Sequence, residues 1–220
     1  MKRIRLPSTV VLMALAFAVL AVFAYTSATT PGDTWITDRV QSIHDATFAR
    51  VLNKTSDFAT QPLITPMAIL CAITAAYLGG LQIGIITALM PCAWVVVPVA
   101  KALFERQRPP LALTYNVTDY SFPSGHSFSA MVLYGFTFYV ASVYMQRRLP
   151  RLFLQAACAW LIIGTGLQRI YIGAHWPSDV AGGFLLAGLF IAGGIALHRW
   201  ADSPAKGRGR AGKRSTQEAF

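Results

Sequence analysis

Charged side chains are scarce in this chain of 220 residues, of which 13% are Asp, Glu, Lys or Arg and 55% are hydrophobic. Soluble domains carry about 25% charged residues, so lipid is the expected surrounding solvent. The three cysteines, Cys71, Cys92 and Cys158, are odd in number and lie in apolar stretches. The sequence therefore indicates no disulfide framework.

Long apolar runs dominate the remaining composition. A bilayer crossing takes roughly 20 mainly apolar residues, and six runs approach that length: 7–25, 63–77, 81–100, 126–145, 152–167 and 180–197. These runs predict an all-α integral membrane bundle of six transmembrane helices over residues 1–200. Between residues 63 and 100 there is no charge, and Gly79 and Gly80 lie mid-run, so this stretch is expected to fold back as two helices.

The formal net charge of +10 first suggests a nucleic-acid partner, but the placement of the charges indicates topology instead. With the N-terminus in the cytoplasm, the inner segments hold twelve cations and two anions, whereas the outer segments hold seven of each. Lys and Arg concentrate on the cytoplasmic side of membrane proteins. We therefore expect both termini in the cytoplasm, the bilayer as a partner, and no nucleic acid.

Three further segments fall outside this simple pattern. Residues 26–61 have apolar side chains at near-helical spacing, which predicts amphipathic helices on the outer surface. Residues 201–220 are rich in Gly, Lys and Arg and are expected to form a disordered basic tail. The first apolar run follows Lys2, Arg3 and Arg5, as a signal peptide would, although its length favours retention as a helix.

Two cations mark the outer end of the third predicted span. Lys101 and Arg108 are seven residues apart, close to two helical turns, so both are expected on one helix face before Pro109 and Pro110 end the helix. Two cations on one face favour an anion, although Lys and Arg also commonly mark a helix end.

The fourth span is predicted to begin with Ser124, Gly125 and His126. Ser is a preferred N-cap residue, Gly allows close approach of a ligand, and free amides at a helix N-terminus bind phosphate. A plain capped helix start with an interfacial His is the alternative interpretation.

Arg169, His175 and Asp179 lie between the fifth and sixth spans. Pro177 suits the first turn of a helix, and Asp179 can reach back to hold one ring nitrogen of His175 protonated. The other ring nitrogen is then free as a nucleophile. A metal site at His126, His175 and Asp179 is the competing interpretation, but the nearby cations would repel a metal ion and favour a phosphate.

These three blocks resemble the signature of the type 2 phosphatidic acid phosphatase family. That signature reads Lys, six residues, Arg-Pro; then Pro-Ser-Gly-His; then Ser-Arg, five residues, His, three residues, Asp. The matching positions are 101–109, 123–126 and 168–179, and Gln168 stands where the family has Ser. The resemblance implies a six-span lipid phosphatase without a metal or other cofactor.

The resemblance also implies the residue roles. His175 attacks phosphorus, Asp179 orients His175, and His126 protonates the leaving oxygen. The phosphoryl oxygens are held by Lys101, Arg108, Ser124, Gly125 and Arg169.

The substrate stays open at this point. A bacterial inner-membrane enzyme with an outward site would act on undecaprenyl diphosphate, phosphatidylglycerol phosphate or the phosphates of lipid A. The same site suits a lipid phosphotransferase, and a silent lipid binder or transporter is a third alternative. The sequence does not set the oligomeric state.

Overall fold

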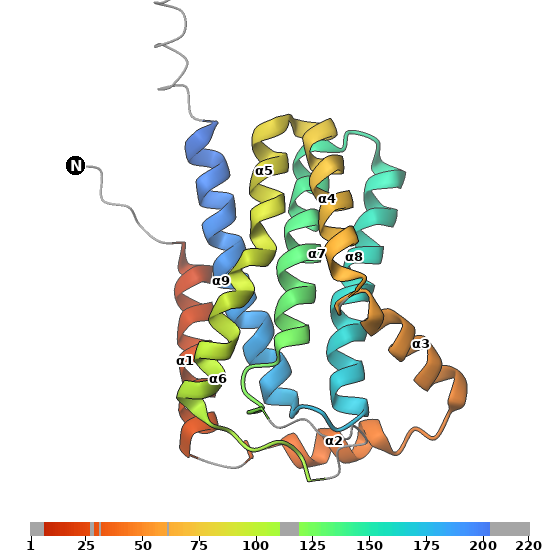
Figure 1. Cartoon of the computed structure of the whole chain (residues 1–220), viewed down its shortest axis with the longest axis vertical. Helices are drawn as coiled ribbons and strands as arrows, with labels where there is room; N and C mark the ends of the chain where they lie inside the picture. Colours follow the sequence, from red (N-terminus) through yellow and green to blue (C-terminus); the bar gives the residue numbers. More distant parts are fainter. Residues whose placement is uncertain (1–6, 27–28, 31, 61, 111–118, 203–220) are drawn as a thin grey trace, which may run out of the picture.

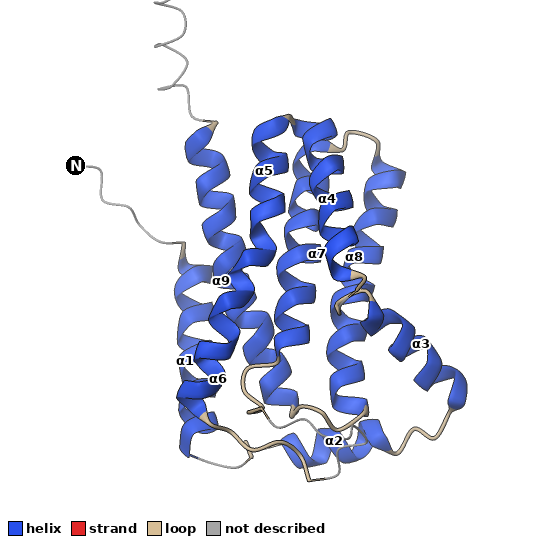
Figure 2. Cartoon of the chain, in the orientation of Figure 1, coloured by secondary structure: helices blue, strands red, loops and turns tan. Residues whose placement is uncertain are grey.

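The computed structural model describes residues 7–26, 29–30, 32–60, 62–110 and 119–202, and all regular structure in these ranges is helical (Figure 2). The elements in chain order are α1 (Ser8–Thr26), α2 (Asp33–Gln41), α3 (Ala46–Asp57), α4 (Ile64–Gly79), α5 (Leu81–Leu89), the 3₁₀ helix η1 (Met90–Val95), α6 (Val96–Phe104), α7 (Gly125–Tyr144), α8 (Arg148–Tyr171) and α9 (Pro177–Ala201). Most of the predicted basic tail, from residue 203 onward, and the cations before residue 7 lie outside the described residues.

The predicted all-α membrane bundle is confirmed. Five helical stretches are long and apolar enough to cross a membrane: α1, the stretch Leu81–Phe104, α7, α8 and α9. The sixth predicted span corresponds to α4, which is apolar but only 16 residues long. At about 1.5 Å per residue α4 is shorter than a ~30 Å hydrocarbon layer.

The outer surface of the bundle is apolar, as a surrounding bilayer requires. Large hydrophobic side chains are exposed along α1, α4 and α8, including Leu15, Ile73 and Phe153. Exposed apolar patches of this extent mark contact with a membrane or another protein. Lipid, rather than water, therefore suits these faces.

α7 is the central helix. It carries ten buried residues, including Phe128 and Phe136, which pack with residues of α5, η1 and α9. On its other side, Ala130, Leu133 and Tyr134 pack against α4 and α8. This central position fixes the N-terminus of α7, and with it the residues that begin there.

Pro91 interrupts the predicted span 81–100. Proline lacks a backbone N–H and clashes with the preceding turn of an α-helix, and the chain adopts the tighter 3₁₀ form of η1 from Met90 to Val95. The span therefore consists of α5, η1 and α6, seen as the bent yellow-green path in Figure 1.

The loops divide between the two ends of the bundle. The connections α6–α7 and α8–α9 lie at the end that α2 crosses, and the connections α4–α5 and α7–α8 lie at the opposite end (Figure 1). All three predicted site blocks thus gather at the end that α2 crosses.

At the opposite end His198 lies between the hydroxyls of Tyr139 and Tyr144, each 2.7 Å from a ring nitrogen.

Small residues bring α9 close to its neighbours. A Cβ on Gly183 would lie 2.6 Å from the carbonyl oxygen of Ser124 and 3.2 Å from the amide nitrogen of Phe128. Glycine lets transmembrane helices approach through their backbones. Gly183 therefore allows the N-terminal ends of α7 and α9, which carry two of the site blocks, to meet.

Candidate active site

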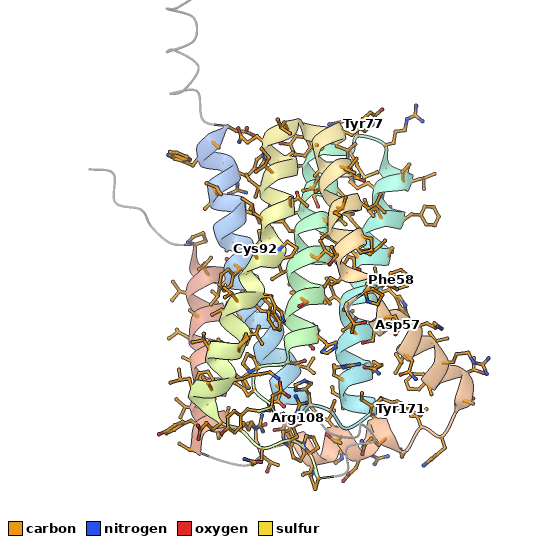
Figure 3. The ribbon with its side chains drawn as sticks, in the orientation of Figure 1. Asp57, Phe58, Tyr77, Cys92, Arg108 and Tyr171 are labelled. Atoms are coloured by element: carbon orange, nitrogen blue, oxygen red, sulfur yellow. The ribbon has the colours of Figure 1, made fainter. Side chains whose placement is uncertain are left out.

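One cavity of about 1190 Å³ joins most of the predicted site residues. Its polar end lies where α6 ends and α7 and α9 begin, the region in which Figure 3 labels Arg108. The predicted residues that line it are Lys101, Arg108, Gly125, His126, Arg169 and His175. Ser124 and Asp179 are fully buried behind this lining.

The predicted helical placement of Arg108 is wrong. α6 ends at Phe104, where Glu105 adopts a left-handed conformation with φ of 48°, and the chain continues without helix through Arg108. The two cations still meet, because both bind Asp119. Arg108 Nη2 donates to Asp119 Oδ1 at 2.5 Å, and Lys101 Nζ pairs with Asp119 Oδ2.

Arg108 also reaches the predicted nucleophile. Its Nη1 donates to the carbonyl oxygen of Ala174 at 2.5 Å and lies 3.4 Å from Nε2 of His175. Because guanidinium only donates hydrogen bonds, this contact fits a neutral His175 whose proton is on Nδ1. Nε2 is then the nitrogen with a lone pair at the cavity.

Burial keeps the ring of His175 neutral. Its side chain is almost completely buried, and desolvation lowers its pKa from 6.5 to about 4, against the opposing effect of Asp179. Nδ1 of His175 lies 3.6 Å from Oδ2 of Asp179 and has no hydrogen-bond partner among the described residues. The predicted support of His175 by Asp179 is therefore a close approach and not a formed hydrogen bond.

Ser124 is the N-cap of α7, as predicted. Its Oγ accepts from the amide of Ser127 at 3.4 Å and from the Ser127 hydroxyl at 2.9 Å, and the residue is completely buried. Its backbone N–H donates to the carbonyl oxygen of Asp179 at 3.0 Å. Ser124 thus ties α7 to α9, while Gly125 and His126 face the cavity.

Sequence reasoning missed a buried ion cluster beneath the site. Arg106, which is 2% exposed, donates from Nη2 to Asp33 Oδ2 and from Nη1 to Asp179 Oδ1, both at 2.6 Å. Asp179 also accepts from the amide of Trp176 at 2.8 Å and from the hydroxyl of Ser121. These three residues thereby fix the position of the Asp179 carboxylate.

Asp33 joins α2 to this cluster. Its carboxylate accepts from the amide of Ser178 at 2.9 Å and from the Ser178 hydroxyl at 2.7 Å. Burial opposes ionisation, but hydrogen bonds from Thr30 and Ser178 hold the pKa of Asp33 below its usual value. α2, which lies in the segment 26–61 predicted to form surface helices, therefore helps to position the residues of the site.

α3 positions the side chain of Arg169 through hydrogen bonds. Arg169 Nε donates to Gln168 Oε1 at 2.5 Å, and its Nη2 donates to Ser56 Oγ at 3.2 Å. Gln168 in turn donates from Nε2 to Asn53 Oδ1 at 2.9 Å. Gln168, the departure from the family pattern, thus forms a bridge from α3 to the Arg169 side chain.

Comparisons with known proteins agree with this arrangement. The family model described as PAP2 superfamily matches residues 79–203, more than half of the chain. Phosphatidylglycerophosphatase B of Bacillus subtilis (strain 168) is 36% identical over 93 residues, which are 40% of this chain and 44% of that protein. The chain therefore spans less than half the length of this curated relative in the match.

A solved structure shares this fold over most of the chain. The crystal structure of a transmembrane PAP2-type phosphatidylglycerolphosphate phosphatase from Bacillus subtilis superposes with a TM-score of 0.74 at 22% identity, covering 88% of this chain and 97% of that one. At this identity the likeness shows the fold. Together with the family match over all three site blocks, it shows that this integral membrane protein belongs to the PAP2 superfamily.

Proposed function

We propose that the chain is a metal-independent phosphatase that removes phosphate from a membrane lipid phosphate or diphosphate through a phosphohistidine intermediate. The observation that carries this proposal is the continuity of one cavity. Its polar end holds three cations and two histidines, and the rest is lined by apolar residues of α4, η1 and α7, such as Ile69, Trp94 and Val132.

The shape of the cavity suits an amphiphilic substrate. A site for a small ligand usually measures about 300–1,000 Å³, and the present cavity is larger, at about 1190 Å³. A phosphate head group at the polar end would leave its hydrocarbon chain beside α4 and η1. Burial of apolar chain surface then adds to the binding energy.

In the first chemical step the lone pair of His175 Nε2 forms a bond to phosphorus. The bond from phosphorus to the lipid oxygen breaks, and His126 gives its proton to that oxygen. Lys101, Arg108, Arg169 and the amide of Gly125 stabilise the charge on the phosphoryl oxygens. Phosphoryl transfer asks a protein mainly for such positioning and positive charge.

In the second step a water molecule attacks the phosphorus of phosphohistidine. His126, now neutral, takes the proton of that water, and the bond from phosphorus to Nε2 breaks. Inorganic phosphate leaves, and both histidines return to their starting states. Asp179 stabilises the positive charge that develops on the His175 ring, from its position 3.6 Å away.

Phosphatidylglycerol phosphate is the first substrate to test. The curated relative is a phosphatidylglycerophosphatase, and undecaprenyl diphosphate and the lipid A phosphates follow as the other candidates. The excess of Lys and Arg in the segments opposite the site supports a site on the outer face of a bacterial inner membrane, with both termini in the cytoplasm.

The test is a parallel assay of purified protein in detergent against these three lipids, with free phosphate and phosphorylated lipid both measured. The expected result is free phosphate from at least one lipid, with activity retained in EDTA. His175→Ala should abolish release while the thermal unfolding midpoint stays near that of wild type. His44→Ala, a change at an exposed histidine of the α2–α3 connection, is the matched control and should leave the rate unchanged.

The alternatives give different results in the same assay. Transfer of phosphate to a second lipid without free phosphate would identify a phosphotransferase. Binding without turnover would identify a lipid binder or transporter. Strong inhibition by EDTA, or wild-type turnover in His175→Ala, would contradict the proposed mechanism.

A further inference from the structure

Asp119 accepts hydrogen bonds from Lys101 and Arg108, two of the residues proposed to bind the phosphoryl group. Its Oδ1 accepts from Arg108 Nη2 at 2.5 Å, its backbone oxygen accepts from Arg108 Nε at 3.0 Å, and its Oδ2 pairs with Lys101 Nζ. With Nη1 bound to Ala174, every nitrogen of Arg108 has an acceptor. A phosphate group that binds both cations therefore competes with this carboxylate for their N–H donors.

Carboxylate and phosphate compete for a guanidinium because both accept its paired N–H donors in the same planar geometry. Burial opposes ionisation of Asp119, but Lys101 and Arg108 hold its pKa below the usual value, so the carboxylate is an anion near neutral pH. It lines the same cavity as His175 and His126.

The exposure of the three side chains shows which of them can leave. The side chain of Asp119 is 53% exposed, whereas those of Lys101 and Arg108 are 12% and 14% exposed. The cations are thus held in the cavity wall, and the carboxylate approaches them from the solvent side. Because about half of the Asp119 side chain is open to solvent, an incoming anion can reach the two cations and replace this carboxylate.

We propose that Asp119 is a further substrate-site residue, whose carboxylate competes with phosphoryl groups for Lys101 and Arg108 and so keeps the affinity of the site for a bare phosphate low. A lipid phosphate gains apolar contacts in the cavity that offset the displacement of Asp119. Inorganic phosphate and soluble phosphate esters have no such contacts. The same competition weakens product binding and favours release of phosphate.

This inference rests on the proposed function for its consequence in catalysis, but its binding component stands without turnover. Asp119→Asn keeps the size of the side chain and removes the charge. We expect inorganic phosphate and orthovanadate to bind about tenfold more tightly to the variant, near the lower end of the effect of one charged hydrogen-bond partner. Binding is measured on purified protein in detergent by the ligand-dependent rise of the unfolding temperature.

Turnover gives the second readout. In Asp119→Asn inorganic phosphate should inhibit hydrolysis of phosphatidylglycerol phosphate at about tenfold lower concentration than in wild type. Asp38→Asn removes an exposed acid of α2 and is the control for the change in net charge, with no expected effect on either readout. A gain of phosphate affinity cannot result from simple structural damage.

The outcomes separate this inference from the proposed function. Tighter phosphate binding in Asp119→Asn, in a protein that hydrolyses no lipid, would uphold the role of Asp119 and contradict the proposed function. Lipid hydrolysis with unchanged or weaker phosphate binding in Asp119→Asn would overturn the role of Asp119 alone. An equal gain in Asp38→Asn would also overturn it, because the effect would then be general to negative charge.

Discussion

The buried pairing of Asp33 with Arg106 makes the stability of the site depend on a surface helix, and Asp33→Ala tests this dependence. Asp33 is 2% exposed and accepts hydrogen bonds from three residues: Thr30, Arg106 and Ser178. The substitution leaves the guanidinium of Arg106 buried with Asp179 as its remaining carboxylate partner. Removing one partner of a buried ion pair costs about 3–5 kcal/mol.

The free energy of unfolding is measured by SDS titration in mixed micelles for wild type, Asp33→Ala and Asp38→Ala. Asp38 is exposed on the same helix, and its removal should change the free energy by no more than about 0.5 kcal/mol. We also expect kcat for lipid phosphate to fall in Asp33→Ala, because Arg106, which positions Asp179, loses its ion pair with Asp33. A loss of stability below about 1 kcal/mol would refute the view that this pair anchors α2 to the site.

Three further predictions concern other supports of the site. Gly183→Ala places a methyl group 2.6 Å from the Ser124 carbonyl and should abolish activity by separating α7 from α9, whereas Gly193→Ala, which meets nothing within 4 Å on the same helix, should keep wild-type activity. Gln168→Ala should lower kcat/KM about tenfold by releasing Arg169 from its hydrogen bond, with the unfolding temperature little changed. Because burial lowers the pKa of His175 to about 4 from 6.5, the unfolded chain binds a proton in this range that the folded chain does not. The free energy of unfolding should therefore fall by up to roughly 3 kcal/mol between about pH 6.5 and pH 4, and this difference should be absent in His175→Gln.

The main features of the fold and site follow from local sequence. Apolar runs predicted the spans because a bilayer crossing requires them, and Ser124 and Pro177 marked the helix starts through capping and backbone geometry. The end of α6 was not predictable in this way. Glu105 takes a left-handed conformation that turns Arg106 inward to two carboxylates, and no periodicity signals such a turn.

The supporting residues are hidden from sequence reasoning by distance along the chain. Asp33 lies 73 positions from Arg106 and 145 from Ser178, in a polar segment where an acidic residue is expected to be solvated. Asn53 is 115 positions from Gln168. Only the three-dimensional packing of α2 and α3 against the bundle reveals that these polar side chains hold Asp179 and Arg169.

The central claim is that His175 carries the phosphoryl group during hydrolysis, and trapping the intermediate tests it most directly. Protein turning over a lipid labelled with ³²P in its phosphate is quenched in SDS at alkaline pH, digested and mapped. We expect an acid-labile, base-stable label on the peptide that contains His175, absent in His175→Ala and retained in His44→Ala. Label on another residue, or steady turnover with no label on the protein, would contradict it.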